Sequence, residues 1–115
     1  QCVIGSHCKL ETNAYITAYS EVGDRVFVAP GVVTSNDNFI GRTEERFKHF
    51  TGAVLKDGAR VGAGAVLLPG VTLAEEAVLA AGAVLTKDGV PGQVHIGVPA
   101  KPVRPVPPEQ LLSDK

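Results

Sequence analysis

The sequence predicts an all-β repeat fold, in which short strands and bends alternate every six residues. Three observations carry this prediction. Aliphatic side chains recur six residues apart, a small or slender side chain precedes each of them by two, and most glycines lie outside these pairs. Residues two apart point to the same side of a strand, so each hexad supplies one inward-facing pair. Glycine and proline between the pairs favour bends, because glycine permits positive φ and proline fixes φ.

Twelve such pairs run through the chain in two blocks. An α-helix would require apolar residues at a period of about 3.6 and would be destabilised by these glycines and prolines. A sandwich of antiparallel strands shows turn signals every 8–12 residues or so, without a fixed phase. We therefore expect a strand at each pair. The pairs are Cys2/Ile4, Cys8/Leu10, Ala14/Ile16, Ser20/Val22, Val26/Val28 and Val32/Thr34, then Ala53/Leu55, Ala59/Val61, Ala65/Leu67, Val71/Leu73, Ala77/Leu79 and Ala83/Leu85.

Composition excludes several classes of protein. With 115 residues, 44% hydrophobic and 20% charged, the chain is one small globular domain at most. A net charge of −1 lacks the basic footprint of a nucleic-acid binder. We see neither an apolar run of about 18 residues nor a signal peptide, so no membrane partner is expected. Because position 1 is Gln, we expect the chain to be a piece of a longer protein.

Two cysteines are too few for a disulfide-stapled scaffold. Cys2 and Cys8 occupy the small position of successive hexads, so we expect them to pack apart as free thiols. Free thiols are typical of a reducing compartment, which favours a cytoplasmic protein.

The repeat breaks once. From Thr34 to Leu55 is 21 residues where six would suffice, so we expect an excursion over 36–51. It holds Phe39, Phe47 and Phe50 together with many ionic side chains. A plain stack of repeats has no pocket of its own, and long loops in compact domains are usually functional. We expect the site here; the alternative is a solvated loop whose phenylalanines cover the coil beneath.

The aliphatic-plus-small hexads resemble those of the hexapeptide-repeat acyltransferases, over residues 2–100. The resemblance implies a left-handed parallel β-helix of about four triangular coils, three hexads each, over 1–100. It also implies a homotrimer that binds the cofactor between neighbouring subunits. The segment 101–115 is too proline-rich to continue the coil, and we expect an extended tail with a short turn of helix near 108–112.

The second block, GAGAVLLPG, AAGAVLTKD and GVPAKPVR, resembles the coenzyme A-binding end of these enzymes. The resemblance implies acetyl-CoA as co-substrate, with Ala63, Ala81 and Lys87 as contacts and Lys101 and Arg104 on its phosphates. The alternative for each alanine is good coil sequence without a ligand, and for each cation an ordinary solvated charge.

The loop gives a more specific resemblance. TSNDNFIGRTEERF followed by GARVGAGA is similar to the acetyl-CoA-dependent N-acetyltransferases that act on UDP-linked amino sugars in bacterial surface-polysaccharide assembly. The resemblance implies a catalytic Asn36 where the coil opens into the loop. It also implies an Arg-acidic segment, in which Arg42 binds substrate and Glu44 and Glu45 take part in catalysis.

The chemistry of the acceptor supports this interpretation. An amine is partly neutral near pH 7 and attacks a thioester without strong base help, whereas a hydroxyl normally needs a positioned histidine. The junction carries Asn36 and none of the three histidines, which favours an amine oriented by a carboxamide oxygen. Glu44 or Glu45 would then hold the ammonium or a sugar hydroxyl. His49 is expected to be a substrate contact and remains the possible base.

Three alternatives stay open. An O-acetyltransferase of the same fold would use His49 as base. A γ-class carbonic anhydrase would need three histidines on zinc, but His7, His49 and His95 have neither the close pair nor the register, so no metal is expected. A non-catalytic hexapeptide scaffold is the third.

Overall fold

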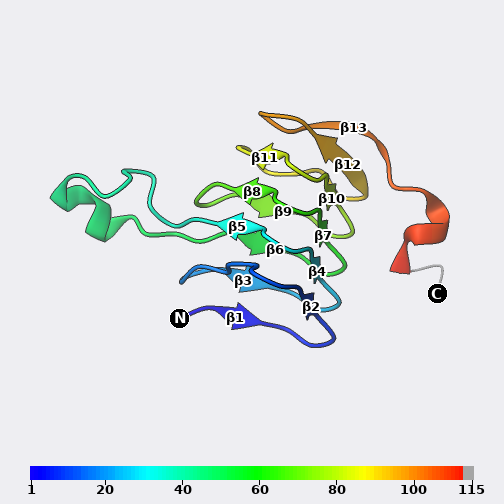
Figure 1. Ribbon diagram of the computed structural model, residues 1–115, viewed down its shortest axis with the longest axis horizontal. Helices are drawn as coiled ribbons and strands as arrows, with labels where there is room; N and C mark the ends of the chain where they lie inside the picture. The colour runs from blue at the N-terminus through cyan, green and yellow to red at the C-terminus, as the bar shows by residue number, and fades with distance from the viewer. Residues whose placement is uncertain (113–115) are drawn as a thin grey trace.

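The structure, a computed structural model that describes residues 1–112, is a triangular prism of stacked coils (Figure 1). Nearly every strand is only two residues long, because each face of the prism offers room for one inward pair before the chain bends. In chain order the strands are β1 (Val3–Ile4), β2 (Lys9–Leu10), β3 (Glu21–Val22), β4 (Phe27–Val28), β5 (Val33–Thr34), β6 (Val54–Leu55), β7 (Arg60–Val61), β8 (Val66–Leu67), β9 (Thr72–Leu73), β10 (Val78–Leu79), β11 (Val84–Leu85), β12 (Gln93–Ile96) and β13 (Lys101–Pro105).

Three sheets form the faces of the prism, in the orders β1-β3-β6-β9, β2-β4-β7-β10-β12-β13 and β5-β8-β11. Successive coils pair in parallel, with Ile4 opposite Val22 and Leu55 opposite Leu73. Tyr15 makes an isolated parallel bridge to Val33 in place of a full strand. The predicted pairs therefore all lie in parallel strands or this bridge, and the arrangement of three hexads in each of four coils is confirmed.

The corners explain the spacing of the glycines. In each of the two blocks, one residue in every six has positive φ, which turns the chain from one face to the next. Glycine adopts this conformation without strain, whereas most side chains resist it. The corner residues are His7, Asn13, Tyr19, Arg25 and Gly31 in the first block and Gly58, Gly64, Gly70, Glu76 and Gly82 in the second.

The core is a column of inward pairs. Leu55, Leu67 and Leu79 are at most 1% exposed, as are their small partners such as Ala53 and Ala65. The first coil is less well covered than the others: Cys8, Ala14 and Ile16 are half-buried against the core, and Cys2, Ile4 and Leu10 are exposed. Ile4 is 42% and Leu10 is 40% exposed because β1 and β2 are the end strands of their sheets.

The two cysteines are free thiols, as expected. Cys2 is exposed, and the Cys8 Sγ donates to the Gly23 carbonyl oxygen at 3.0 Å.

The C-terminal segment closes the other end of the prism. β12 pairs in parallel above β10, and β13 then pairs antiparallel with β12, which the sequence does not predict. A proline-rich segment can still form an edge strand, because an edge needs only alternate N–H groups. The predicted turn of helix is present as the 3-10 helix η2 (Pro108–Gln110).

Side-chain bonds attach this tail to the prism. The Arg60 Nη2 donates to the Gln110 Oε1 at 2.8 Å, and the Leu112 N–H donates to the Glu76 Oε1 at 2.6 Å. No helix within residues 1–112 is long and apolar enough to cross a membrane.

Candidate active site

A long loop leaves the prism after β5 and returns before β6, extending to one side in Figure 1. Its root is closed by the Thr51 N–H, which donates to the Asn36 carbonyl oxygen at 3.1 Å. The loop contains one short 3-10 helix, η1 (Glu44–Lys48). Its bounds match the predicted excursion over 36–51.

An open pocket of about 660 Å³ lies at the root of this loop. Its lining comes from successive coils at one corner and from the first turn of the loop. Most of the surface is apolar, with a few polar groups, which is typical of small-molecule sites. The lining residues are Tyr15, Thr17, Thr34, Ser35, Asn36, Asp37, Asn38, Ile40, Gly41, Leu68 and Pro69.

Asn36 is the predicted site residue that lies in this pocket. Its side-chain Nδ2 donates to the Ala18 carbonyl oxygen at 3.4 Å, which ties the amide to the neighbouring coil. Within residues 1–112 no protein donor bonds to its Oδ1. The carboxamide oxygen is therefore available to accept a hydrogen bond from a ligand.

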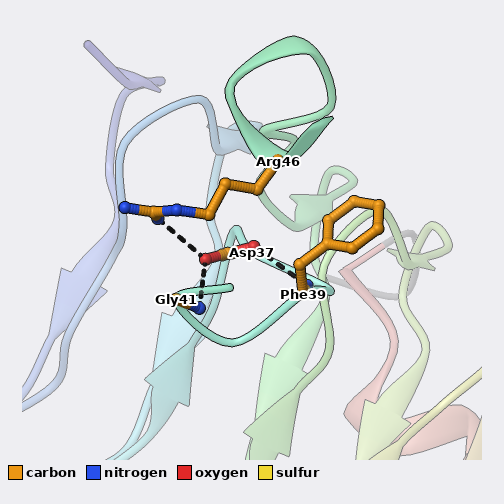
Figure 2. A network of polar contacts seen from close by, with 4 residues as sticks. All are labelled: Asp37, Phe39, Gly41 and Arg46. Atoms are coloured by element: carbon orange, nitrogen blue, oxygen red, sulfur yellow. Dashed lines mark hydrogen bonds and ion pairs between the residues drawn. The ribbon is translucent and has the colours of Figure 1, made fainter. Parts of the chain in front are cut away.

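Asp37 is a polar centre that the sequence analysis missed. Its Oδ1 accepts from the Phe39 N–H at 2.9 Å, and its Oδ2 accepts from the Gly41 N–H at 2.9 Å and from the Arg46 Nη1 at 3.0 Å (Figure 2). The Gly41 N–H is the largest cause that holds the pKa of the Asp37 carboxyl below its usual range, so the group is ionised at neutral pH. The signal was present, since Asp commonly bonds to the N–H two residues on.

Aromatic side chains attach the loop to the prism. The Arg46 guanidinium carbon lies 4.4 Å from the Phe47 ring centroid and 5.5 Å from that of Phe50. The Phe50 ring stacks on Tyr19 of the prism with centroids 6.3 Å apart. Phe50 thus covers the coil beneath the loop, as one of the sequence-based alternatives supposed, and the pocket lies beside it.

The other predicted loop residues do not line the pocket. Arg42, Glu44, Glu45 and His49 are exposed, three of them on or directly after η1. The Glu45 Oε1 lies 3.6 Å from the Lys48 Nζ and 4.0 Å from the His49 Nε2. The structure does not bring these four side chains together with Asn36, so their roles stay predictions.

The histidines are placed apart from the pocket as well. His95 is 1% exposed; its Nε2 accepts from the Val90 N–H at 2.9 Å, and its Nδ1 lies 3.1 Å from the Val78 carbonyl oxygen. This pattern requires a neutral ring with the proton on Nδ1, and it leaves neither nitrogen for a substrate or metal. Among the described residues, His, Cys, Asp and Glu form no group of three that could hold a metal ion.

Two of the predicted cofactor contacts share a corner. Ala63 and Ala81 are exposed on successive coils, where the Gly82 N–H donates to the Ala63 carbonyl oxygen at 3.0 Å. Gly62 has a packing reason at this corner, because a Cβ there would lie 2.5 Å from the Ala81 nitrogen. Close coil stacking therefore requires the glycine at position 62, whether or not this corner also binds a cofactor.

The three cations are exposed and lie on different elements. Lys101 and Arg104 are on β13, with Lys101 opposite Ile96 and Arg104 opposite Val94. Lys87 follows β11. The long loop leaves the prism at the same corner, after β5, two coils below. The corner of Ala63 and the corner of Lys87 are the two ends of the face formed by β5, β8 and β11.

Comparison with known proteins agrees with this geometry. Residues 57–87 match the model of the hexapeptide repeat of succinyl-transferase. No curated protein sequence matches the chain significantly. The repeat and the coil geometry are those of the left-handed parallel β-helix, the fold that this chain shares with hexapeptide-repeat acetyltransferases.

Solved structures are similar over most of the chain. Serine acetyltransferase from Neisseria gonorrhoeae matches 92% of this chain with a TM-score of 0.77 and 25% identity, and the match spans 39% of the enzyme. A maltose O-acetyltransferase from Clostridium difficile matches 92% of this chain and 59% of its own, with a TM-score of 0.76 and 25% identity.

An N-acyltransferase from Bacillus cereus, solved with dTDP-4-amino-4,6-dideoxyglucose and coenzyme A, has a TM-score of 0.63 at 17% identity. The match covers 95% of this chain and 62% of that one, and at this identity the likeness extends to the fold alone.

Proposed function

We propose that this chain is the β-helix of an acetyl-CoA-dependent N-acetyltransferase that acts on the amino group of a nucleotide-linked amino sugar. The observation that carries the proposal is Asn36. Its carboxamide oxygen, which accepts from no donor of the described residues 1–112, lies in a pocket whose lining includes no histidine. An amine that is partly neutral near pH 7 can attack a thioester without a strong base, so a group that orients it is sufficient.

The reaction fits such a pocket. The neutral amine nitrogen attacks the thioester carbonyl carbon, the C–N bond forms, and the C–S bond breaks to release the coenzyme A thiolate, which takes up a proton from solvent. The surplus amine proton passes to solvent through the open mouth of the pocket. Asn36 accepts one amine N–H and so directs the nitrogen lone pair away from its own oxygen and toward the thioester.

An O-acetyltransferase is the second candidate, and the similarity to a maltose O-acetyltransferase at 25% identity favours it. In that case a hydroxyl acceptor requires a base, and His49 is the histidine of the loop. Its side chain is 57% exposed, and its ring centroid lies 6.1 Å from that of Phe39, the neighbour of two pocket residues.

The experiment that decides between these functions measures thiol release from acetyl-CoA by the full-length protein. The acceptors are UDP- and dTDP-linked amino sugars, each paired with the matching sugar that carries a hydroxyl in place of the amine. Turnover with the amino member alone supports N-acetylation, and turnover with the hydroxyl member supports O-acetylation. A non-catalytic scaffold would show neither turnover nor thermal stabilisation by coenzyme A.

Neutralising Lys101 or Arg104 should raise the KM for acetyl-CoA with a smaller change in kcat. Both cations are exposed on β13, where they can pair with phosphate groups and make no part of the pocket around Asn36. We expect Lys87→Gln to act in the same direction. Steady-state kinetics with acetyl-CoA and with a thioester lacking the 3′-phosphate check this; equal KM values for the two thioesters would remove Lys101 and Arg104 from the cofactor site.

The proposal includes a homotrimer with the cofactor between neighbouring prisms, in the cytoplasm, where Cys2 and Cys8 would stay reduced. Coenzyme A laid along one face of a single prism would be covered from one side only, and a neighbouring prism would supply the second wall. Light scattering of the full-length protein at micromolar concentration should give three times the subunit mass. A monomer under these conditions would contradict the shared cofactor groove.

A further inference from the structure

Asp37 lines the pocket beside Asn36, yet its carboxylate is already occupied. Its two oxygens accept from the Phe39 N–H, the Gly41 N–H and the Arg46 guanidinium at 2.9–3.0 Å (Figure 2). These donors fill three of the four or so lone-pair positions of a carboxylate. Binding a substrate ammonium or removing a proton would require Asp37 to give up bonds it already makes.

The turn that Asp37 holds is a strained part of the pocket wall. Ile40 and Gly41 have φ of 49° and 80°, and both line the pocket. A β-branched residue such as Ile40 strongly disfavours positive φ. The carboxylate bonds to the N–H groups on either side of Ile40, at Phe39 and Gly41, and so stabilises a conformation that Ile40 would not adopt by itself.

The same carboxylate connects this wall to the prism. Its partner Arg46 lies against the rings of Phe47 and Phe50, and the Phe50 ring stacks on Tyr19 at the corner after the first coil. The Asp37 and Arg46 side chains are only 16% and 27% exposed, so the pair is better shielded than the other ion pairs of the loop. A continuous series of contacts thus runs from the pocket wall to the rigid coil.

We propose that Asp37 is a positioning residue of the acceptor site, which holds the 37–41 turn against the prism so that the pocket around Asn36 keeps its shape. This inference rests on the proposed function for its kinetic part only. The structural part, that the carboxylate keeps the turn closed, is independent of which acceptor is used.

The test compares Asp37→Asn with the wild-type full-length protein. The amide keeps the shape of the side chain, but one oxygen cannot serve all three donors and its NH2 group faces an N–H or a guanidinium. We expect the KM for the amino-sugar acceptor to rise roughly tenfold, the scale of one charge-assisted hydrogen bond. The KM for acetyl-CoA should stay unchanged, and kcat should change less than the acceptor KM.

Amide hydrogen exchange provides a readout that needs no activity. The Phe39 and Gly41 amides should exchange roughly tenfold faster in Asp37→Asn than in the wild type. Arg46→Gln should have an effect in the same direction, and the double variant should be less than additive because the two side chains are partners.

The matched control is Asp24→Asn. Asp24 also accepts a backbone N–H, from Ser6 at 2.9 Å, and its pKa is likewise lowered, first by this bond, but it lies at a corner of the prism outside the loop. We expect this variant to leave both KM values and the exchange of the loop amides unchanged.

Each outcome decides the matter. Faster exchange together with a raised acceptor KM supports the proposal. Faster exchange with an unchanged acceptor KM overturns it, because Asp37 would then be a loop residue without effect on the pocket. Unchanged exchange with a loss of kcat also overturns it, because Asp37 would then act on the substrate directly. If the wild type acetylates no amino sugar, the proposed function fails, and the exchange measurement alone still decides whether Asp37 holds the turn.

Discussion

Replacing Leu67 with Asp should abolish folding of the β-helix. Leu67 is fully buried on β8, in the third of four coils, with Thr34 below it and Leu85 above it. A carboxylate there would be desolvated without a partner, a penalty comparable to the whole free energy of unfolding of a small domain, about 5–15 kcal/mol. Far-UV circular dichroism should show loss of the β signal, and the protein should be recovered as an unfolded or aggregated chain.

Two further variants make this expectation quantitative. Leu67→Ala should lower the free energy of unfolding in urea by about 2–5 kcal/mol, the range for truncating a buried leucine. Val33→Asp is the matched control, because Val33 is 42% exposed on the outer side of the neighbouring strand β5. A folded Leu67→Asp protein with a stability near that of Val33→Asp would mean that Leu67 does not face the core.

The coils could be predicted from the sequence because every hexad must meet the same physical conditions. Each inward pair must be apolar and small enough to share the column, and each corner must accept positive φ. Residues such as Leu55, Leu73 and Gly64 meet these conditions with a fixed period, so their positions follow without knowledge of the tertiary contacts. The handedness did not follow from the period and came from the resemblance to known proteins.

The ends of the prism were harder to predict because no repeat operates there. His95 takes an inward position opposite Leu79 on β10, although a histidine in a proline-rich region gives no periodic signal. Its burial is compensated by the Val90 N–H and the Val78 carbonyl oxygen, which lie on different elements. Only the folded chain brings these partners together, and the same holds for the antiparallel pairing of β13.

Of the candidate site residues, Asn36 is the one whose position could be predicted from the sequence. Asn36 could be placed because it stands where the repeat ends, and a residue at that point must lie at the root of the loop. Arg42, Glu44, Glu45 and His49 lie within the loop, where the backbone path depends on contacts that span several residues. The pairing of Asp37 with Arg46 and the stacking of Phe50 on Tyr19 determine that path, and neither has a periodic signature.

Replacing Asn36 with Ala should lower kcat by about 10²-fold, the usual scale for removing one positioned polar group at a reacting centre. No protein donor within residues 1–112 bonds to the Asn36 carboxamide oxygen, so it is available to a substrate N–H, and alanine removes that contact. The wild-type rate should rise with pH through about 8, as for a substrate ammonium similar to an α-amine. Asn36 has no pKa of its own, so Asn36→Ala should lower the rate without moving this midpoint.

His49→Ala is the variant that separates the two candidate functions. Under N-acetylation the loss should be several-fold at most, because the His49 side chain is 57% exposed directly after η1, and its Nε2 lies 4.0 Å from the Glu45 carboxylate. Under O-acetylation an imidazole must take the hydroxyl proton, so the rate of His49→Ala should fall by 10²–10⁴-fold or so. A large loss in His49→Ala combined with a mild one in Asn36→Ala would contradict the amine mechanism. The hydroxyl sugar would then be the acceptor, and the loop would have to bring His49 to the pocket when substrate binds.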